Sequence, residues 1–134
     1  MILVDTSILI GVLKKTQNEK SVLFHSVVKS GLSYGISEYT YLELLQGARN
    51  YKEYNFLNEY LLDINIYFLP KTIGIYEKAA SIFFRLRRQG ITPRSTIDVL
   101  IALTAMEYDL SLLHNDKDFD MMADKIPELK SYTK

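Results

Sequence analysis

The sequence contains no cysteine in its 134 residues. Without cysteine there is no disulfide framework, no zinc–thiolate site and no thiol nucleophile. The same absence is compatible with a reducing cytosol. A chain of this length buries roughly two-thirds of its unfolded surface. Its 48% of hydrophobic residues therefore supply a core that needs neither a disulfide nor a structural metal.

A long apolar run is also missing. The most apolar stretch, residues 1–13, is interrupted by Asp5. No basic region precedes this stretch and no small-residue cleavage site follows it, which argues against a signal peptide. No other segment reaches the ~18 apolar residues of a membrane span. We therefore expect a soluble, cytoplasmic protein with no membrane partner.

Neither sign of charge is in excess, because 16 Lys and Arg balance 16 Asp and Glu. A neutral chain does not indicate nucleic-acid binding by its net charge. A local basic rim around an acidic centre can nevertheless steer a nucleic acid towards a site. Net charge thus leaves the class of partner open.

Apolar periodicity predicts strands that alternate with helices. The expected strands cover residues 1–4, 33–36, 64–69 and 111–113, with a further edge strand in the tail after Pro127. The expected helices cover residues 8–15, 19–29, 37–49, 51–63, 73–89 and 95–108, with a short acidic helix or loop at 118–124. Such alternation predicts an α/β fold with a mostly parallel sheet. No linker or repeat is visible, so we expect a single domain over residues 1–134.

Four acidic residues, far apart in the sequence, stand in apolar surroundings. Asp5 follows the first strand, Glu43 lies within a helix, Asp98 begins a strongly apolar helix, and Asp116 follows the fourth strand. A carboxylate among buried apolar residues is costly unless a cation or a hydrogen-bond donor faces it. Because sites form at the carboxyl ends of parallel strands, these acids are candidates for one cluster.

Three of the acids also have a simpler structural interpretation. Asp5 can cap the helix that follows it, and Ser95-Thr-Ile-Asp98 matches a capping box. Glu43 alone is typical of a solvated helix face. Gly47 lies one turn further along that face, where it would let a substrate or another backbone approach.

The fourth acid is ambiguous, because Asp116 and Asp118 alternate with Asp120. A calcium loop of the EF-hand type is excluded, since positions six and twelve from Asp116 are Met121 and Pro127 rather than glycine and glutamate. Asp116 is preferred over Asp118 because it is nearer the end of the strand.

If the acids converge, they offer oxygen ligands only, and this favours Mg²⁺ or Mn²⁺ over Zn²⁺. The chemistry that fits such a site is phosphodiester hydrolysis, in which one metal activates water and a second steadies the leaving oxygen. Basic residues that either form a phosphate-binding rim or are simply solvated are Arg85, Arg87, Arg88, Arg94 and Lys117. The ten tyrosines are interpreted first as core and interface residues.

Four motifs in order, over nearly the whole chain, resemble those of PIN-domain ribonucleases, and among these the VapC-type toxins of bacterial and archaeal toxin–antitoxin pairs. They are Ile2-Leu-Val-Asp-Thr-Ser-Ile-Leu9, Tyr41-Leu-Glu-Leu-Leu-Gln-Gly47, Ile97-Asp-Val-Leu-Ile-Ala102 and Leu113-His-Asn-Asp-Lys-Asp-Phe119. The resemblance implies a three-layer α/β/α sandwich around a parallel sheet of four to five strands. It also implies endoribonuclease activity that depends on Mg²⁺ or Mn²⁺.

Carried over by position, the resemblance makes Asp5, Glu43 and Asp98 the core catalytic metal ligands. Asp116 becomes the fourth acid, for a second or more weakly held metal, and Asp118 remains the alternative. Of the basic residues, Arg94 and Lys117 are taken as the candidates for binding RNA. The target RNA and the number of metal ions stay open.

The resemblance further implies that Thr6 or Ser7 orients Asp5 or a metal-bound water. The fourth motif departs from the family, because His114 and Asn115 stand where threonine or arginine is frequent. Family members typically form homodimers, and the C-terminal segment of an antitoxin occupies a groove near the acids. Residues 51–60 are a candidate wall of such a groove.

Other functions remain compatible with the sequence. One is a non-toxic PIN nuclease of RNA processing or repair, and another is a catalytically silent binding module that uses the same cleft. A phosphoacceptor receiver domain is disfavoured, because Asp5 stands alone after the first strand where that class has paired acids.

Overall fold

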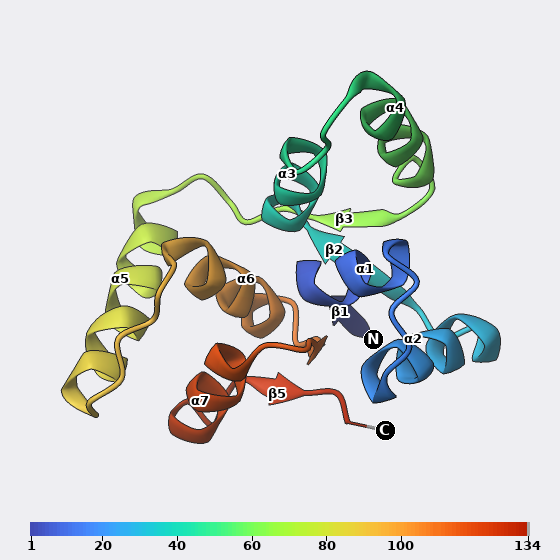
Figure 1. Ribbon diagram of the computed structural model, residues 1–134. Helices are drawn as coiled ribbons and strands as arrows, with labels where there is room; N and C mark the ends of the chain where they lie inside the picture. Colours follow the sequence, from blue (N-terminus) through green and yellow to red (C-terminus); the bar gives the residue numbers. More distant parts are fainter. Residues whose placement is uncertain (134) are drawn as a thin grey trace.

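The computed structural model describes residues 1–133, in which five strands and seven helices alternate (Figure 1). The strands are β1 (Ile2–Val4), β2 (Tyr34–Ser37), β3 (Asn65–Tyr67), β4 (Ser111–Leu113) and β5 (Lys130–Ser131). The helices are α1 (Thr6–Leu13), α2 (Glu19–Ser30), α3 (Glu38–Gln46), α4 (Tyr51–Tyr60), α5 (Ile73–Arg88), α6 (Thr96–Glu107) and α7 (Lys117–Lys125). The segment around residues 118–124 is thus a helix, and the tail forms the expected edge strand.

The strands form one parallel sheet in the order β3-β2-β1-β4-β5. In register, Ile2 of β1 lies between Tyr34 of β2 and Ser111 of β4. Chain order therefore reverses at β1, with β2 and β3 on one side and β4 and β5 on the other. Open parallel sheets place their sites at such a reversal, beyond the carboxyl ends of the strands.

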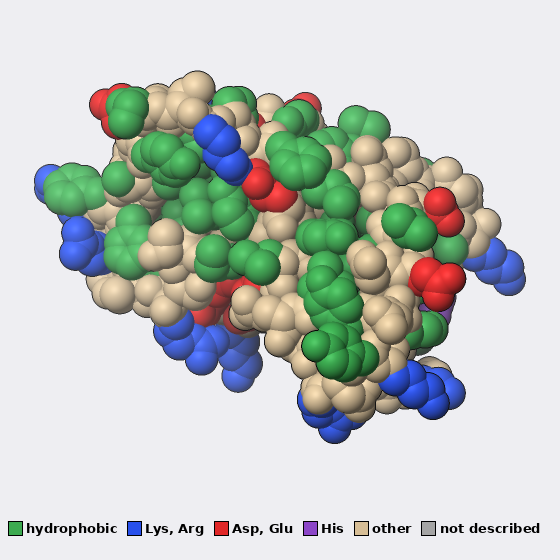
Figure 2. Space-filling view, turned by 90° about the horizontal axis from the view of Figure 1, so that it is seen from above, with side chains coloured by type: hydrophobic (Ala, Val, Ile, Leu, Met, Phe, Trp, Pro, Cys, Tyr) green, Lys and Arg blue, Asp and Glu red, His purple; other side chains and the backbone are tan. Residues whose placement is uncertain are grey.

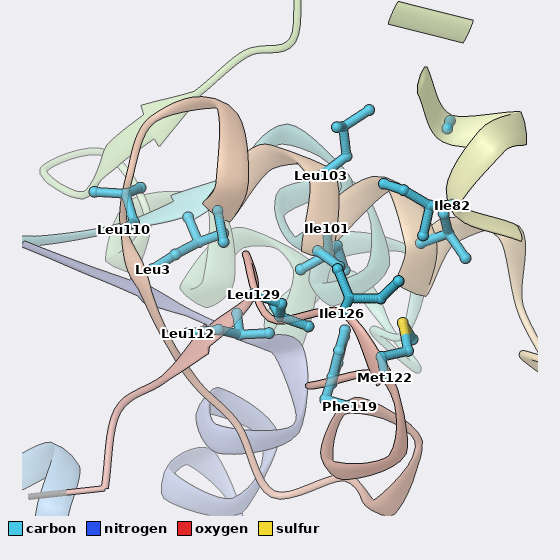
Figure 3. Packing of buried hydrophobic residues seen from close by; sticks show 14 of the residues in the cluster. Leu3, Ile82, Ile101, Leu103, Leu110, Leu112, Phe119, Met122, Ile126 and Leu129 are labelled. Atoms are coloured by element: carbon cyan, nitrogen blue, oxygen red, sulfur yellow. The ribbon is translucent and has the colours of Figure 1, made fainter. Parts of the chain in front are cut away.

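Helices cover both faces of the sheet and make three layers. Because side chains alternate along a strand, Leu3 packs on one face while Ile2 and Val4 pack on the other. The Leu3 face is covered by α5, α6 and α7, and Figure 3 shows Phe119 and Met122 of α7 in this cluster. The opposite face is covered by residues of α1, α2 and α3. The α/β/α sandwich predicted from the sequence is confirmed.

Three helices differ from the predicted bounds by two residues or more. Helix α1 begins two residues early, because the Asp5 side chain accepts a hydrogen bond from the backbone N–H of Ser7 and so caps it. Helices α3 and α4 each end three residues early. Gly47 is the C-cap of α3 rather than an interior residue. Gly47 still lines a groove together with Glu43.

The tyrosines were interpreted as core and interface residues, and six of them, Tyr34, Tyr39, Tyr41, Tyr60, Tyr67 and Tyr132, pack at the edge of the core without being fully buried. All ten are half-buried or exposed, and Tyr51 is 87% exposed. The phenolic hydroxyl accounts for this peripheral placement, since it requires a polar partner or water. The hydroxyl of Tyr108, for example, donates to the backbone oxygen of Phe68 at 2.6 Å.

Helix α6 is apolar on nearly every side and packs against both α5 and α3. Its buried side chains are Val99, Ile101, Ala102, Leu103, Thr104 and Ala105. This burial leaves Asp98, in the first turn, as its acidic residue at the amino-terminal end. In the described part of the chain, no helix combines the length and the apolar character that crossing a membrane requires.

Candidate functional site

The acidic residues lie at one end of the sheet, where β1, β2 and β4 finish side by side. Asp5 directly follows β1, and its backbone N–H donates to the Leu113 oxygen of β4 at 2.9 Å. Asp116 follows β4, while β2 leads directly into α3 with Glu43. Helix α3 also contacts α6, at whose start Asp98 lies. Parallel pairing thus gathers carboxylates from four distant parts of the sequence.

Asp5 is buried and is held by Ser7. Its Oδ2 accepts hydrogen bonds from the Ser7 backbone N–H at 3.0 Å and from the Ser7 hydroxyl at 2.6 Å. The same hydroxyl accepts from the Asn115 N–H at 2.9 Å, across 108 residues. Ser7 therefore joins the end of β1 to the loop after β4. Burial raises the pKa of Asp5, and the negative charge of Glu43 adds to this, while the hydrogen bonds from Ser7 and Thr6 oppose it.

Two threonine hydroxyls support Glu43. The Thr6 hydroxyl donates to Glu43 Oε1 at 2.7 Å and lies 3.1 Å from the hydroxyl of buried Thr40. Because Thr6 has one hydroxyl hydrogen and gives it to Glu43, Thr40 is the donor within the threonine pair. Sequence reasoning missed Thr40, although its position three residues before Glu43 on the same helix face was available as an indication.

Asp98 is free of the capping role that its sequence predicts. Ser95 caps α6 by accepting a hydrogen bond from the Ile97 N–H at 3.1 Å, not from the N–H of Asp98. The reciprocal capping box is therefore not formed. Asp98 remains a half-buried carboxylate at the helix start.

Electrostatics show that the acids share one environment. The pKa of Asp98 is raised to about 7, first by burial and then by the negative charges of Asp5, Asp116, Glu43 and Asp118. Burial and like charges both disfavour ionisation. The negative charge of every other acid proposed from the sequence therefore contributes to the raised pKa of Asp98.

The two candidates for the fourth acid have different partners. Asp116 Oδ1 accepts from the Asp118 N–H at 2.9 Å and caps α7. Asp118 Oδ2 accepts from Arg94 Nε at 2.9 Å, whereas Arg94 Nη2 lies 3.8 Å from Asp116 Oδ1. The charge of Asp116 also raises the pKa of Asp98 more than the charge of Asp118 does. These contacts favour Asp116 as the fourth acid.

His114 supports the loop that carries Asp116. Its Nδ1 accepts from the Asp116 N–H at 3.2 Å, and its Nε2 lies 3.4 Å from the Ser131 hydroxyl. Burial lowers the pKa of His114, which favours the neutral ring that the first of these bonds requires. Both ring nitrogens are engaged, so His114 holds the backbone of the site.

Among the basic residues considered for a phosphate-binding rim, Arg94 lies against the acids. Arg85 pairs with Glu128 at 3.1 Å, while Arg87 and Arg88 lie over aromatic rings of α5. Lys117 is exposed at the first position of α7, next to Asp116. Arg94 and Lys117 are thus the two that the fold brings to the site.

The donor set fits a hard divalent cation in its chemistry, because it consists of carboxylate and hydroxyl oxygens. Within residues 1–133, no three acidic or histidine side chains stand close enough together to enclose a metal ion by themselves. Magnesium does not require such an enclosure, since it keeps several waters and takes one or two protein carboxylates. A cation would also relieve the repulsion that, after burial, raises the pKa of Asp98.

Comparison with known proteins gives matches over most of the chain. The PIN domain family profile matches residues 2–125. The sequence is 28% identical over 124 residues to VapC ribonuclease Mb1587 of Mycobacterium bovis and to ribonuclease VapC11 of Mycobacterium tuberculosis. Each match covers 92% of this chain and 92% of the relative.

Solved structures share the fold. VapBC2 from Rickettsia felis, bound to a promoter DNA fragment, gives a TM-score of 0.73 at 18% identity, covering 98% of both chains. VapBC-1 from nontypeable Haemophilus influenzae gives 0.72 at 26% identity, covering 98% of this chain and 97% of the other. FitAcB from Neisseria gonorrhoeae gives 0.69 at 22% identity, covering 99% and 97%.

Proposed function

Since the chain belongs to the PIN domain family, we propose that it is a Mg²⁺- or Mn²⁺-dependent endoribonuclease and the toxin of a toxin–antitoxin pair. The observation that carries the proposal is the placement of acids from distant parts of the sequence at one end of the sheet, where β1, β2 and β4 finish. After burial, the negative charges of four of these acids raise the pKa of Asp98. The similarity to relatives named VapC ribonucleases supports RNA as the substrate.

In the proposed site, Asp5, Glu43 and Asp98 are the core metal ligands, and Asp116 is the fourth acid. When bound, a divalent cation supplies an activated water and stabilises charge on the phosphate. The protein keeps the ligand oxygens in place. Ser7 fixes Asp5, and the Thr6 hydroxyl fixes Glu43.

The proposed antitoxin site is a groove of about 690 Å³ between α1, α3 and α4. Its walls combine apolar and basic side chains with the catalytic Glu43, and α4 contributes to them as expected. The residues are Ile10, Leu13, Lys14, Glu43, Leu44, Gly47, Ala48, Arg49, Asn50, Lys52, Glu53, Phe56 and Leu57. Because Glu43 forms part of the wall, a peptide in this groove would reach the acids. Such a partner is supported by the similar solved structures, which include VapBC proteins and a toxin–antitoxin complex from Klebsiella pneumoniae.

A homodimer is proposed from exposed apolar side chains on α3, on both sides of β3 and at the start of α5. These residues are Leu42, Leu62, Phe68, Ile73 and Tyr76, each between 52% and 74% exposed. Figure 2 looks down on the top of Figure 1 and shows hydrophobic side chains gathered broadly over that face. Extended apolar patches on a folded chain mark interaction surfaces.

The proposal is tested by incubating purified protein with total RNA and Mg²⁺ or Mn²⁺, and by expressing it in growing cells. We expect cleavage that EDTA abolishes and growth arrest when the protein is expressed. Asp98→Asn removes both effects. Asp109→Asn is the matched control, because Asp109 is 83% exposed and pairs with Lys130 away from the four acids.

Two other results would support the alternative functions considered from the sequence. Metal-dependent cleavage without growth arrest would identify a nuclease of RNA processing rather than a toxin. Failure to bind Mn²⁺ or to cut RNA would identify a silent binding module and contradict the proposed activity.

A further inference from the structure

Arg94 occupies the outer edge of the acidic cluster. Its Nε donates to Asp118 Oδ2 at 2.9 Å, and its Nη2 lies 3.8 Å from Asp116 Oδ1. The negative charge of Asp98 also contributes to the raised pKa of the Arg94 guanidinium. One arginine of this chain therefore adjoins two of the carboxylates, including the proposed fourth acid, and lies within electrostatic range of Asp98.

The backbone around Arg94 is fixed, although its side chain is 77% exposed. On one side Pro93 is buried, and on the other Ser95 caps α6. Asp118 is also fixed, because its side chain is 14% exposed and its N–H donates to Asp116. The contact thus joins two anchored segments and places the guanidinium beside Asp118.

A guanidinium at this position competes with a metal ion. Arginine offers several N–H donors in a planar fork and remains charged at any pH relevant to the protein. Its Nε already donates a hydrogen bond to one oxygen of Asp118, and its Nη2 lies 3.8 Å from an oxygen of Asp116. A second divalent cation bound by these two acids would lie close to the positive charge of Arg94, and like charges repel.

We propose that Arg94 takes the place of a second divalent ion at Asp116 and Asp118, so that the site holds one ion. Asp118 is then the residue that positions Arg94, not a metal ligand. This inference rests on the proposed function, since it assumes that the inner acids bind a cation. It adds to that function that the second positive charge of the site comes from Arg94 rather than from a second metal ion.

The test is the number of Mn²⁺ ions bound per chain, measured by calorimetry and by electron paramagnetic resonance without substrate. We expect one ion for the unchanged protein and two for Arg94→Gln, the second binding more weakly. Arg94→Lys keeps the charge and should bind one ion. Asp118→Asn, which removes one of the two outer carboxylates, should also bind one.

Arg85→Gln is the matched control, because Arg85 forms a comparable exposed ion pair with Glu128 and should leave the count at one. Two ions in the unchanged protein, or one ion of unaltered affinity in Arg94→Gln, would overturn the assignment. Binding of no ion by any variant would instead overturn the proposed function, and the inference with it. Circular dichroism of each variant verifies that the fold is retained.

Discussion

The hydroxyl of Thr6 donates a 2.7 Å hydrogen bond to Oε1 of Glu43, joining residues 37 positions apart in the sequence. Thr6 begins the helix after β1, and Glu43 lies on the helix after β2. The bond therefore fixes one acid of the cluster relative to the strand end that carries another. Buried Thr40 completes the support from within α3.

Replacing Thr6 by valine is expected to weaken Mn²⁺ binding and RNA cleavage about 10- to 100-fold, the range found when groups that orient metal ligands are removed. Glu43 loses the donor that holds it, while the volume of the side chain is nearly kept. Thr6→Ser retains the hydroxyl and should bind Mn²⁺ within a few-fold of the unchanged protein. Equal affinity in the valine variant would show that Glu43 needs no such support.

Thr40→Val is expected to lower the free energy of unfolding by about 1 kcal/mol, the usual net contribution of a buried hydrogen bond. Urea denaturation measures this loss. Thr104→Val is the matched control, because Thr104 is equally buried and its hydroxyl donates to the Leu100 oxygen within α6. Both variants should be destabilised, but only Thr40→Val should also weaken Mn²⁺ binding. A similar effect of both on Mn²⁺ would count against a positioning role for Thr40.

Without metal, the protein is expected to lose stability as pH rises from about 4 to about 7. The pKa of Asp98 is about 7 in the folded chain, above its value of about 4 in an unfolded chain, so the folded state binds this proton more tightly. The favourable contribution is complete below the unfolded value and is lost as pH rises through the folded value. Burial raises the pKa of Asp5, which adds a trend of the same sign.

Urea denaturation at several pH values measures this trend. Asp98→Asn should show a smaller loss of stability between pH 4 and 7, because asparagine does not titrate. Saturating Mn²⁺ should restore stability near pH 7 by binding the folded state. Identical pH profiles of the unchanged protein and the variant would contradict the assignment of the shift to Asp98.

Gly35→Ala is expected to destabilise the sheet by about 1–3 kcal/mol, as overpacking of a tight core does. A Cβ at Gly35 would lie 2.6 Å from both the Asn65 backbone oxygen and the ring of Tyr67. The oxygen belongs to the paired strand β3 and cannot move without breaking the ladder. Gly11→Ala is the control, since nothing lies within 4 Å of its Cβ. It should leave stability unchanged or raise it, because alanine favours a helix.

Local features of the sequence predicted much of this structure. The caps at Asp5, Ser37 and Ser95 follow from side chains that bond to backbone groups two residues later. The alternation of apolar strands and helices likewise predicted the three layers. These features depend on neighbours in the sequence, so no knowledge of the tertiary packing was needed.

The contacts that organise the acids could not be predicted in this way. The bond from Asn115 to Ser7 spans 108 residues, and that from Arg94 to Asp118 spans 24. Each depends on the order of the strands and on the path of a loop, which local patterns do not specify. The acids themselves were identifiable because carboxylates in apolar segments are unusual, whereas Thr40 resembled an ordinary helix residue.

The central claim is that Asp5, Glu43 and Asp98, carboxylates from three distant parts of the chain, together hold a divalent cation. Calorimetric titration of Mn²⁺ at pH 7.5 (roughly half a unit above the Asp98 pKa of about 7) tests it without any assumption about the RNA. We predict that the unchanged protein and Asp109→Asn bind Mn²⁺ alike, and that Asp98→Asn binds it at least ~10-fold more weakly. Binding of Mn²⁺ by Asp98→Asn as tightly as by the unchanged protein would contradict the account.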